Sequence, residues 1–286
     1  MKIAVLSGKG GTGKTLVSVN LACISNDSCY IDCDVEEPNG HLFFKPEIEN
    51  REKVTVKIPT VDFNLCNGCR KCVDFCKFNA LAYINNKLFI FEKICHSCGG
   101  CLIVCPQKAL TEKNKEIGEI QEGFSENVKV ITGIMNIGEE TGVSIIKNLL
   151  SKNIDKKHHV FIDCPPGSGC SVMESVKDAD YCLLVAEPTI FGVHNFNMIY
   201  NLVKILNKPY GAVLNKCFND RENPAEEFCL NNNIKILQKI PYDNELAKIN
   251  SNGKIAVREN ENYNKMFEQL LGKVKEEVRH ETTVNY

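Results

Sequence analysis

The segment from residue 8 to residue 15 has the residue types and spacing of a phosphate-binding loop, because it fits G-x4-G-K-[ST] without a mismatch. Four glycines let the backbone turn so that successive N–H groups converge on one point, where a following helix adds partial positive charge. Lys14 would reach the β and γ phosphates of a nucleotide, and the Thr15 hydroxyl would ligate magnesium. The alternative is a glycine-rich turn that binds nothing. We therefore predict a nucleotide site formed by Gly8, Lys9, Gly10, Gly11, Thr12, Gly13, Lys14 and Thr15.

Eight cysteines lie between positions 61 and 111 in two runs, and each run has the spacing C-x2-C-x2-C-x3-C. The repeated spacing indicates an internal duplication. Zinc usually takes two separated pairs of ligands, whereas two such compact runs are typical of bacterial ferredoxins with two [4Fe–4S] clusters. Zinc and simple buried thiols are the alternatives. Because the fourth cysteine of each run serves the other cluster, we predict cluster one on Cys66, Cys69, Cys72 and Cys105, and cluster two on Cys95, Cys98, Cys101 and Cys76.

Two details of these runs bear on the prediction. Lys77 follows the first run where the ferredoxin pattern prefers proline, which affects the local turn but removes no ligand. His96 lies inside the second run, and we expect it to be an exposed loop residue because the cysteines already fill both clusters. Basic residues outnumber acidic ones here and would mostly balance the clusters' negative charge, although Arg70 and Lys71 are candidates to dock an acidic redox partner.

Lys9 makes the phosphate loop more specific. Residues 9 to 15 match K-G-G-x-G-K-[ST], and the chain here resembles the deviant Walker A ATPases, the group that includes MinD, ParA, Mrp and the nitrogenase iron protein. The resemblance implies an ATP-dependent homodimer in which Lys9 reaches across the interface to the partner's nucleotide. It also implies that Asp34 positions the attacking water, and that Asn215 and the loop at Pro241 lie beside the adenine.

A second acidic position follows from the Walker B pattern. The apolar run 159–163 ends in Asp163, and a carboxylate at the end of a strand beside a phosphate loop is suited to hold a magnesium-bound water. Lys9, Lys14, Asp34 and Asp163 are therefore the predicted catalytic residues. Cys170 follows Asp163 at the spacing of a cluster-bridging cysteine in the nitrogenase iron protein, but no second matching cysteine is apparent.

The elements that must position these residues follow an α/β rhythm, with apolar runs that predict strands at 3–6, 28–33, 128–131, 159–163, 181–186, 211–214 and 234–240. We expect a doubly wound, mostly parallel sheet of the P-loop NTPase type. A small α+β ferredoxin-like domain at 61–111 would be inserted into an ATPase domain built from 1–60 and 112–286. The stretch 266–274 has helical spacing and is expected to pack on the sheet rather than bind a membrane.

The composition and net charge limit the partners and the cellular compartment that we expect. The net charge of -2 and pI near 6.3 give no general attraction to nucleic acid or anionic lipid. The first residues lack the features of a signal peptide, and no apolar run approaches a membrane span, so we expect a cytoplasmic protein. In such a compartment sixteen cysteines favour metal ligation over disulfides, and the eight outside the two runs are expected to be mainly small buried side chains.

Three functions are compatible with these motifs, and all involve ATP, Mg²⁺ and a homodimer. The first is a redox ATPase whose nucleotide state controls electron passage between two [4Fe–4S] clusters and a partner protein. The second is an iron–sulfur carrier or assembly ATPase of the Mrp kind, which is disfavoured because carriers hold labile clusters on few exposed cysteines. The third is a MinD/ParA-like positioning ATPase, which would bind membrane or DNA, and the sequence offers little for either.

Overall fold

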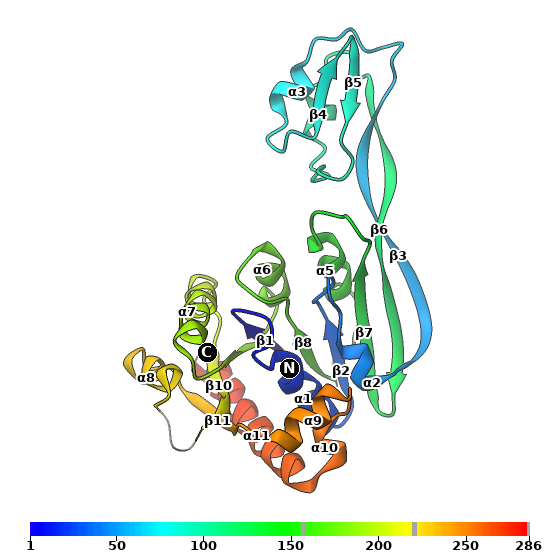
Figure 1. The fold of residues 1–286 in the computed structure, drawn as a ribbon. Helices are drawn as coiled ribbons and strands as arrows, with labels where there is room; N and C mark the ends of the chain where they lie inside the picture. Colours follow the sequence, from blue (N-terminus) through cyan, green and yellow to red (C-terminus); the bar gives the residue numbers. More distant parts are fainter. Residues whose placement is uncertain (156–157, 219–221, 285–286) are drawn as a thin grey trace.

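The computed structural model describes residues 1–155, 158–218 and 222–284. Within these ranges one nine-stranded sheet has the order β11-β10-β9-β1-β8-β2-β7-β6-β3 (Figure 1). Neighbouring strands from β11 to β7 are parallel, whereas β7, β6 and β3 are antiparallel. The expected mostly parallel α/β sheet of the P-loop NTPase type is confirmed. Its strands are β1 (Lys2–Ser7), β2 (Ser28–Asp32), β3 (Glu47–Val61), β6 (Leu110–Ser125), β7 (Val128–Met135), β8 (His159–Asp163), β9 (Tyr181–Ala186), β10 (Tyr210–Cys217) and β11 (Ile236–Pro241).

Helices cover both faces of the sheet, which is why its central strands are apolar throughout: Ile3 and Leu6 of β1 are both fully buried. One face packs against helices whose apolar residues join a single core with Ile3. These helices are α1 (Lys14–Ile24), α2 (Gly40–Phe44), α9 (Asn244–Ser251), α10 (Ala256–Glu259) and α11 (Glu261–Val284). The other face packs against α5 (Val143–Leu150), α6 (Cys170–Val176), α7 (Ile190–Ile205) and α8 (Pro224–Asn231).

The last helix, α11, lies along the body of the protein. Phe267, Leu270 and Val274 are buried in the core that also contains residues of α1. The predicted packing of this helix on the sheet is therefore confirmed. No helix in the described part of the chain is long and apolar enough to cross a membrane.

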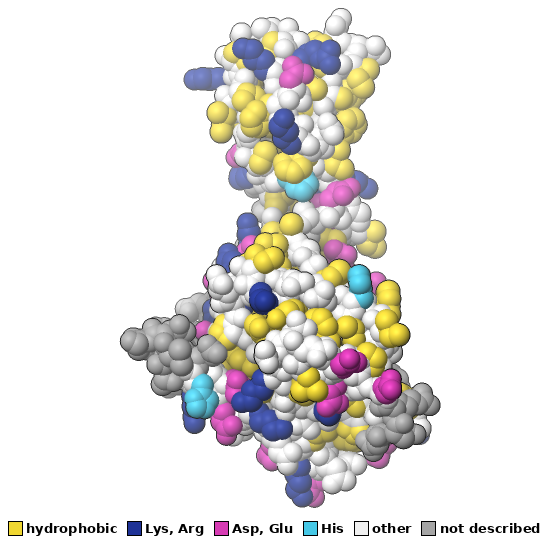
Figure 2. Space-filling view, turned by 90° about the vertical axis from the view of Figure 1, so that its left-hand side faces the viewer, with side chains coloured by type: hydrophobic (Ala, Val, Ile, Leu, Met, Phe, Trp, Pro, Cys, Tyr) yellow, Lys and Arg dark blue, Asp and Glu magenta, His cyan; other side chains and the backbone are white. Residues whose placement is uncertain are grey.

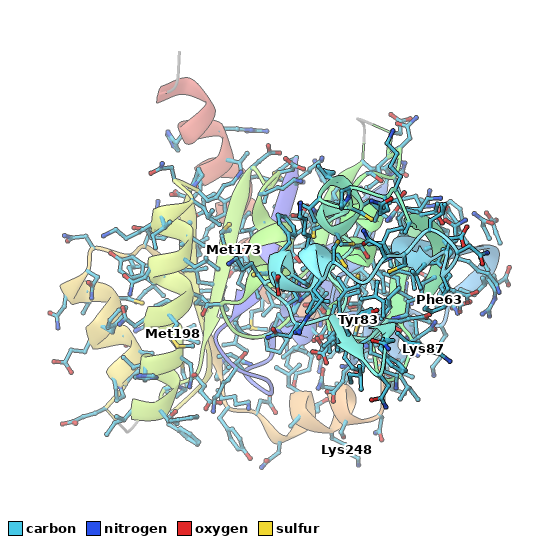
Figure 3. The ribbon with its side chains drawn as sticks, turned by 90° about the horizontal axis from the view of Figure 1, so that it is seen from above. Phe63, Tyr83, Lys87, Met173, Met198 and Lys248 are labelled. Atoms are coloured by element: carbon cyan, nitrogen blue, oxygen red, sulfur yellow. The ribbon has the colours of Figure 1, made fainter. Side chains whose placement is uncertain are left out.

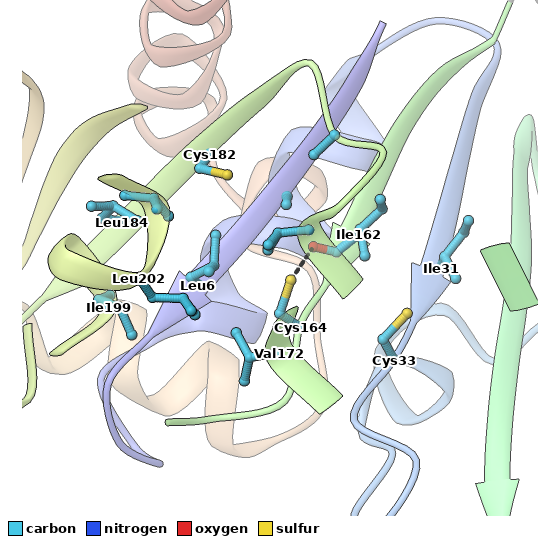
Figure 4. Close-up of a cluster of buried hydrophobic side chains, with 14 of the residues drawn as sticks. Leu6, Ile31, Cys33, Ile162, Cys164, Val172, Cys182, Leu184, Ile199 and Leu202 are labelled. Atoms are coloured by element: carbon cyan, nitrogen blue, oxygen red, sulfur yellow. Dashed lines mark hydrogen bonds between the residues drawn. The ribbon is translucent and has the colours of Figure 1, made fainter. Parts of the chain in front are cut away.

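Several cysteines outside the two runs are buried in the core on the opposite face of the sheet from α11. Cys33, Cys164 and Cys182 lie among apolar side chains on the face covered by α6 and α7 (Figure 4). The Cys164 thiol donates a long hydrogen bond to the Ile162 carbonyl, at 3.8 Å. These three cysteines have the packing role that the sequence predicted. Cys170, in contrast, is exposed at the start of α6.

The chain from β3 to β6 forms an arm that stands away from the body. A two-stranded ribbon of β3 and β6 leads out from the sheet and ends at the Val61–Leu110 pair. The cysteine-bearing chain between them forms a separate lobe above a narrower waist (Figures 1 and 2). This lobe contains α3 (Lys71–Phe75), β4 (Leu81–Ile84), β5 (Lys87–Ile90) and α4 (Gly100–Ile103).

The ribbon was not expected from the sequence. Most side chains of β3 from Glu47 to Lys53 are exposed, because this stretch is polar on both sides of the strand. The apolar alternation begins only at Val54 and continues through Val56 and Ile58, where the ribbon contacts the body. Seen from above, the arm stands over the β7 side of the sheet and leaves α7, which carries Met198, uncovered (Figure 3).

Candidate functional site

The phosphate loop connects β1 to α1, and its shape requires glycine at particular positions. Gly11 and Gly13 have φ values of +79° and +99°, a region that other residues rarely adopt. At Gly8 an added Cβ would lie 2.0 Å from the Asn195 carbonyl oxygen, and at Gly13 it would lie 2.0 Å from Asn215 Nδ2. The loop can therefore form only because these positions carry no side chain.

Two residues at the end of β10 hold the loop in place. Asn215 Nδ2 donates to the Thr12 carbonyl at 2.8 Å, and Lys216 Nζ donates to the Gly11 carbonyl at 2.7 Å. Asn215 is almost fully buried, so its hydrogen bond fixes the loop against the sheet. The sequence singled out Asn215 for an adenine contact; the structure gives it this positioning contact, and the adenine contact stays a prediction.

Pro241 ends β11, next to β10. Beyond it, the rings of Tyr242 and Phe218 stack with centroids 5.0 Å apart. Pro241 thus lies at the same edge of the sheet as Asn215, where the resemblance predicts the base. No contact between Pro241 and the phosphate loop is present among the described hydrogen bonds, so its role is also a prediction.

Lys14 and the two predicted carboxylates lie close together. Lys14 Nζ is 2.6 Å from Asp163 Oδ1 and 3.8 Å from Asp34 Oδ2. The Tyr30 hydroxyl donates to Asp163 Oδ2 at 2.8 Å, so both carboxylate oxygens have partners. Sequence reasoning missed Tyr30, because a tyrosine inside an apolar strand resembles an ordinary core residue. The structure therefore adds Tyr30 to the predicted cluster as a residue that orients Asp163.

Asp32 is a second residue that the sequence did not single out. Its carboxylate accepts hydrogen bonds from the backbone N–H groups of Asp34, Asn39 and Gly40, at 3.1, 3.1 and 2.8 Å. Asp32 is fully buried, and its three hydrogen bonds hold the loop that carries Asp34 in place.

The charges of this cluster influence one another. Burial raises the pKa of Asp34 to about 6, against the opposing effect of Lys14, and the Asp163 charge adds to the increase. Burial and then the Asp163 charge also raise the pKa of Asp32. Burial alone would lower the pKa of Lys14, but the charge and hydrogen bond of Asp163 reverse this effect. Lys14 therefore remains protonated, as a phosphate-binding lysine must.

A cavity of about 640 Å³ opens in front of these groups. It is lined by three glycines of the phosphate loop, by Lys14, Thr15 and Asp34, and by residues 250–253 at the end of α9. This volume lies within the range of small-molecule sites and leaves room for a nucleotide. The structure thus brings Lys14, Thr15 and Asp34 to one cavity. Asp163 does not line the cavity, but it accepts a hydrogen bond from Lys14.

Lys9 does not line this cavity. It forms an ion pair with Glu187, and its Nζ lies 5.2 Å from the centroid of the Phe191 ring. Glu187 also lies near Lys216, with 3.6 Å between charged atoms. The structure therefore does not place Lys9 with the other predicted catalytic residues, and its predicted reach to a partner's nucleotide is untested.

The eight cysteines of the arm surround two separate hollows. Within the described residues, no three His, Cys, Asp or Glu side chains gather closely enough to hold a single metal ion. The cysteines instead line the walls of the hollows, each of which takes three cysteines from one run and one from the other. One hollow is lined by Cys66, Cys69, Cys72 and Cys105, and the other by Cys76, Cys95, Cys98 and Cys101.

Comparison with known proteins agrees with the fold of the body. The chain is 31% identical over 270 residues to one uncharacterized protein of Methanocaldococcus jannaschii, covering 91% of this chain and 93% of that protein. A second uncharacterized protein of the same organism is 32% identical over 282 residues, covering 96% of this chain and 97% of that protein.

Solved structures of similar fold have lower identity. The cell division ATPase MinD of Pyrococcus furiosus has a TM-score of 0.59 at 20% identity, covering 96% of this chain and 98% of that one. MinD of Pyrococcus horikoshii, complexed with Mg-ADP, has a TM-score of 0.60 at 20% identity, covering 96% and 95%. A putative plasmid partition protein of Borrelia burgdorferi, bound to AMPPNP, has a TM-score of 0.57 at 15% identity, covering 96% and 98%.

Residues 3–257 match the family described as the CobQ/CobB/MinD/ParA nucleotide binding domain. This range begins in β1, contains the phosphate loop and Asp163, and extends past the end of α9. The chain therefore belongs to the CobQ/CobB/MinD/ParA family of nucleotide-binding proteins.

Proposed function

We propose that this protein hydrolyses ATP as a nucleotide-dependent dimer. The observation that carries the proposal is the convergence of Lys14, Asp34 and Asp163 at the glycine loop. Lys14 and the loop N–H groups would stabilise charge on the transferred phosphoryl group, and Asp34 would orient the attacking water. Lys14 would exchange the Asp163 carboxylate for the β and γ phosphates as the nucleotide enters.

The residues present suit magnesium. Thr15 offers a hydroxyl at the start of α1 as a direct ligand, and Asp163 offers a carboxylate at the end of β8 that would hold a magnesium-bound water. Magnesium would neutralise phosphate charge when bound. Tyr30 would keep Asp163 oriented during this exchange, because its hydroxyl bonds the oxygen that Lys14 does not use.

We further propose that the arm carries two [4Fe–4S] clusters, one in each cysteine-lined hollow. A four-iron cluster takes one thiolate at each of four separate irons, so its ligands surround a cavity instead of meeting at one point. Zinc requires four ligands around a single ion. The arrangement of the cysteines around two hollows, without a point of convergence among the described residues, favours clusters over zinc.

Two candidate functions differ in what ATP hydrolysis would accomplish. The comparisons favour a MinD/ParA-like positioning ATPase, because the similar folds include proteins named for cell division and plasmid partition. The arm favours a redox ATPase, because eight cysteines around two hollows have no evident use in positioning. An assembly ATPase of the Mrp kind receives less support, since four cysteines line each hollow and would hold a cluster firmly.

Metal analysis of the anaerobically purified and reconstituted chain tests the arm. We expect about eight irons and eight acid-labile sulfides per chain, falling to about four when Cys69 and Cys72 are both changed to alanine. Cys170→Ala is the matched control and should retain all the iron. Zinc in place of iron, or no metal, would contradict the cluster proposal, and iron loss in Cys170→Ala would point to a bridging cluster.

The ATPase proposal has a separate test. Asp34→Asn and Lys9→Ala should each reduce the ATP turnover rate by at least about a hundredfold, as removal of one catalytic group commonly does. Turnover close to that of the unchanged protein in either variant would remove that residue from the mechanism. Binding of the protein to lipid vesicles or duplex DNA in the presence of ATP would instead support positioning.

A further inference from the structure

The arm meets the body at a loop of residues 136–142, which follows β7 and leads into α5; we call this loop the joint. Lys115 of β6 forms an ion pair with Glu139 of the joint at 2.6 Å, and only 15% and 13% of these side chains are exposed. Lys115 Nζ also donates to the Glu92 carbonyl at 3.1 Å, on the lobe of the arm. Lys115 therefore connects the joint to the lobe that bears the cysteines.

The joint is also attached to the nucleotide site. Val35, which follows Asp34, accepts a hydrogen bond through its carbonyl from the Met135 N–H at 2.9 Å. Its side chain packs so closely on Gly142 that an added Cβ there would lie 2.2 Å from Val35 Cγ2. Val35 thus contacts Met135, which immediately precedes the joint, and Gly142, which ends it, and a displacement of Asp34 would act on both.

On its other side the joint faces one of the two cysteine-lined hollows. A cleft between arm and body is lined by Lys93, Cys95, His96, Lys115 and Glu139, among others. Cys95 and His96 also line the hollow predicted for cluster two, and the His96 ring stacks on Phe78 with centroids 3.8 Å apart. None of the cysteines predicted for cluster one lines this cleft. The two hollows therefore differ in their contact with the body.

We propose that the joint couples the nucleotide site to residues 92–98, so that the surroundings of cluster two, and not those of cluster one, respond to nucleotide. The role of these residues as a cluster site rests on the function proposed above. When Lys14 moves from Asp163 and Asp34 to a nucleotide, the loop at Asp34 loses a partner and can shift. Val35 passes this shift to the joint, and the Glu139–Lys115 pair passes it to the base of the lobe.

Hydrogen–deuterium exchange of the full-length chain tests the coupling, with or without iron bound. With a saturating, non-hydrolysed Mg-ATP analogue, we expect exchange in residues 92–98 to change by about fivefold or more, and exchange in 66–72, which hold three of the cysteines predicted for cluster one, to remain the same. In Glu139→Gln the response of 92–98 should largely disappear while residues around Asp34 still respond. A combined Lys115→Gln and Glu139→Gln variant should lose no more than either single variant, because both residues belong to one pair.

Glu116→Gln is the matched control, since the Glu116 side chain pairs with Lys53 at 2.8 Å on the same ribbon. Its contact with the joint, from Asn136 Nδ2, is made through its backbone carbonyl, which the substitution leaves in place. It should keep the full response. A full response in Glu139→Gln would overturn the proposal, as would an equal response in 66–72. Indifference of 92–98 to nucleotide, with a response around Asp34, would also overturn it. Iron content is measured separately, so failure of the cluster proposal is distinguishable from failure of the coupling.

Discussion

Asp34→Asn should stabilise the nucleotide-free protein at alkaline pH while abolishing ATP hydrolysis. The pKa of Asp34 is raised to about 6 in the folded protein, chiefly by burial. An aspartate in an unfolded chain has a pKa of about 3.9. Between these two values the folded state binds more protons than the unfolded state, so stability falls as pH rises through this window. Above it, the charged carboxylate destabilises the fold by a constant amount.

The magnitude follows from the difference of about two pKa units, which corresponds to about 3 kcal/mol at most. The side chain of Asp34 is 17% exposed, and solvent screening reduces the effect, so we expect about 1.5 kcal/mol. Asparagine has nearly the same shape and no charge. The variant should therefore be more stable than the unchanged protein by about 1.5 kcal/mol at pH 8 and by almost nothing at pH 4.

Urea unfolding of both proteins at pH 8 and pH 4, without nucleotide, measures this difference directly. Glu37→Gln is the control, because Glu37 lies exposed in the same loop, and it should change stability by no more than about 0.5 kcal/mol. A destabilised Asp34→Asn protein at pH 8, or the same difference at both pH values, would refute the reasoning. A gain in stability with full ATP turnover would show that Asp34 is not kept for catalysis.

Three further substitutions test the site. Tyr30→Phe removes the hydrogen bond to Asp163 and should lower the free energy of unfolding by about 1.5–3 kcal/mol, measured by urea titration; a loss near zero would contradict its orienting role. Gly13→Ala should weaken binding of a fluorescent ATP analogue at least about tenfold, because φ is +99° there, whereas Gly272→Ala, in α11 with open space around it and outside the cavity lining, should bind normally. Lys9→Ala should change unfolding by no more than about 1 kcal/mol, yet light scattering should show no ATP-dependent dimer; a dimer that persists would exclude Lys9 from the interface.

The sequence was most informative where function depends on a short pattern of residue types. The phosphate loop follows from Gly8 to Thr15 alone, and Asp163 follows from its place at the end of an apolar run. The grouping of the eight cysteines around two hollows was predictable as well, because the fixed spacing within each run limits which thiols can approach one another. In these cases the chemistry and the local backbone conformation both require the same residue types at fixed spacing, so the motif is recognisable in the sequence.

The sequence was less informative where a contact joins distant segments. Tyr30 meets Asp163 across 133 positions of the chain, and nothing near Tyr30 indicates this partner. Asn215 was singled out, but its bond to the Thr12 carbonyl depends on the packing of β10 beside the loop. The ribbon was missed because the first half of its outer strand, residues 47–53, lacks an apolar face. The Lys115–Glu139 pair was missed because it consists of residues common on any surface.

The central claim is that nucleotide and cluster states depend on each other, and the reduction potentials of the reconstituted protein test it most directly. We would titrate both clusters anaerobically by EPR with no nucleotide, with Mg-ADP and with a non-hydrolysed Mg-ATP analogue. We expect the potential of cluster two to shift by at least about 60 mV between nucleotide states. For a one-electron couple, this shift means that the oxidised and reduced forms differ about tenfold in their affinity for nucleotide. The claim would be contradicted if neither cluster changed its potential among the three nucleotide states.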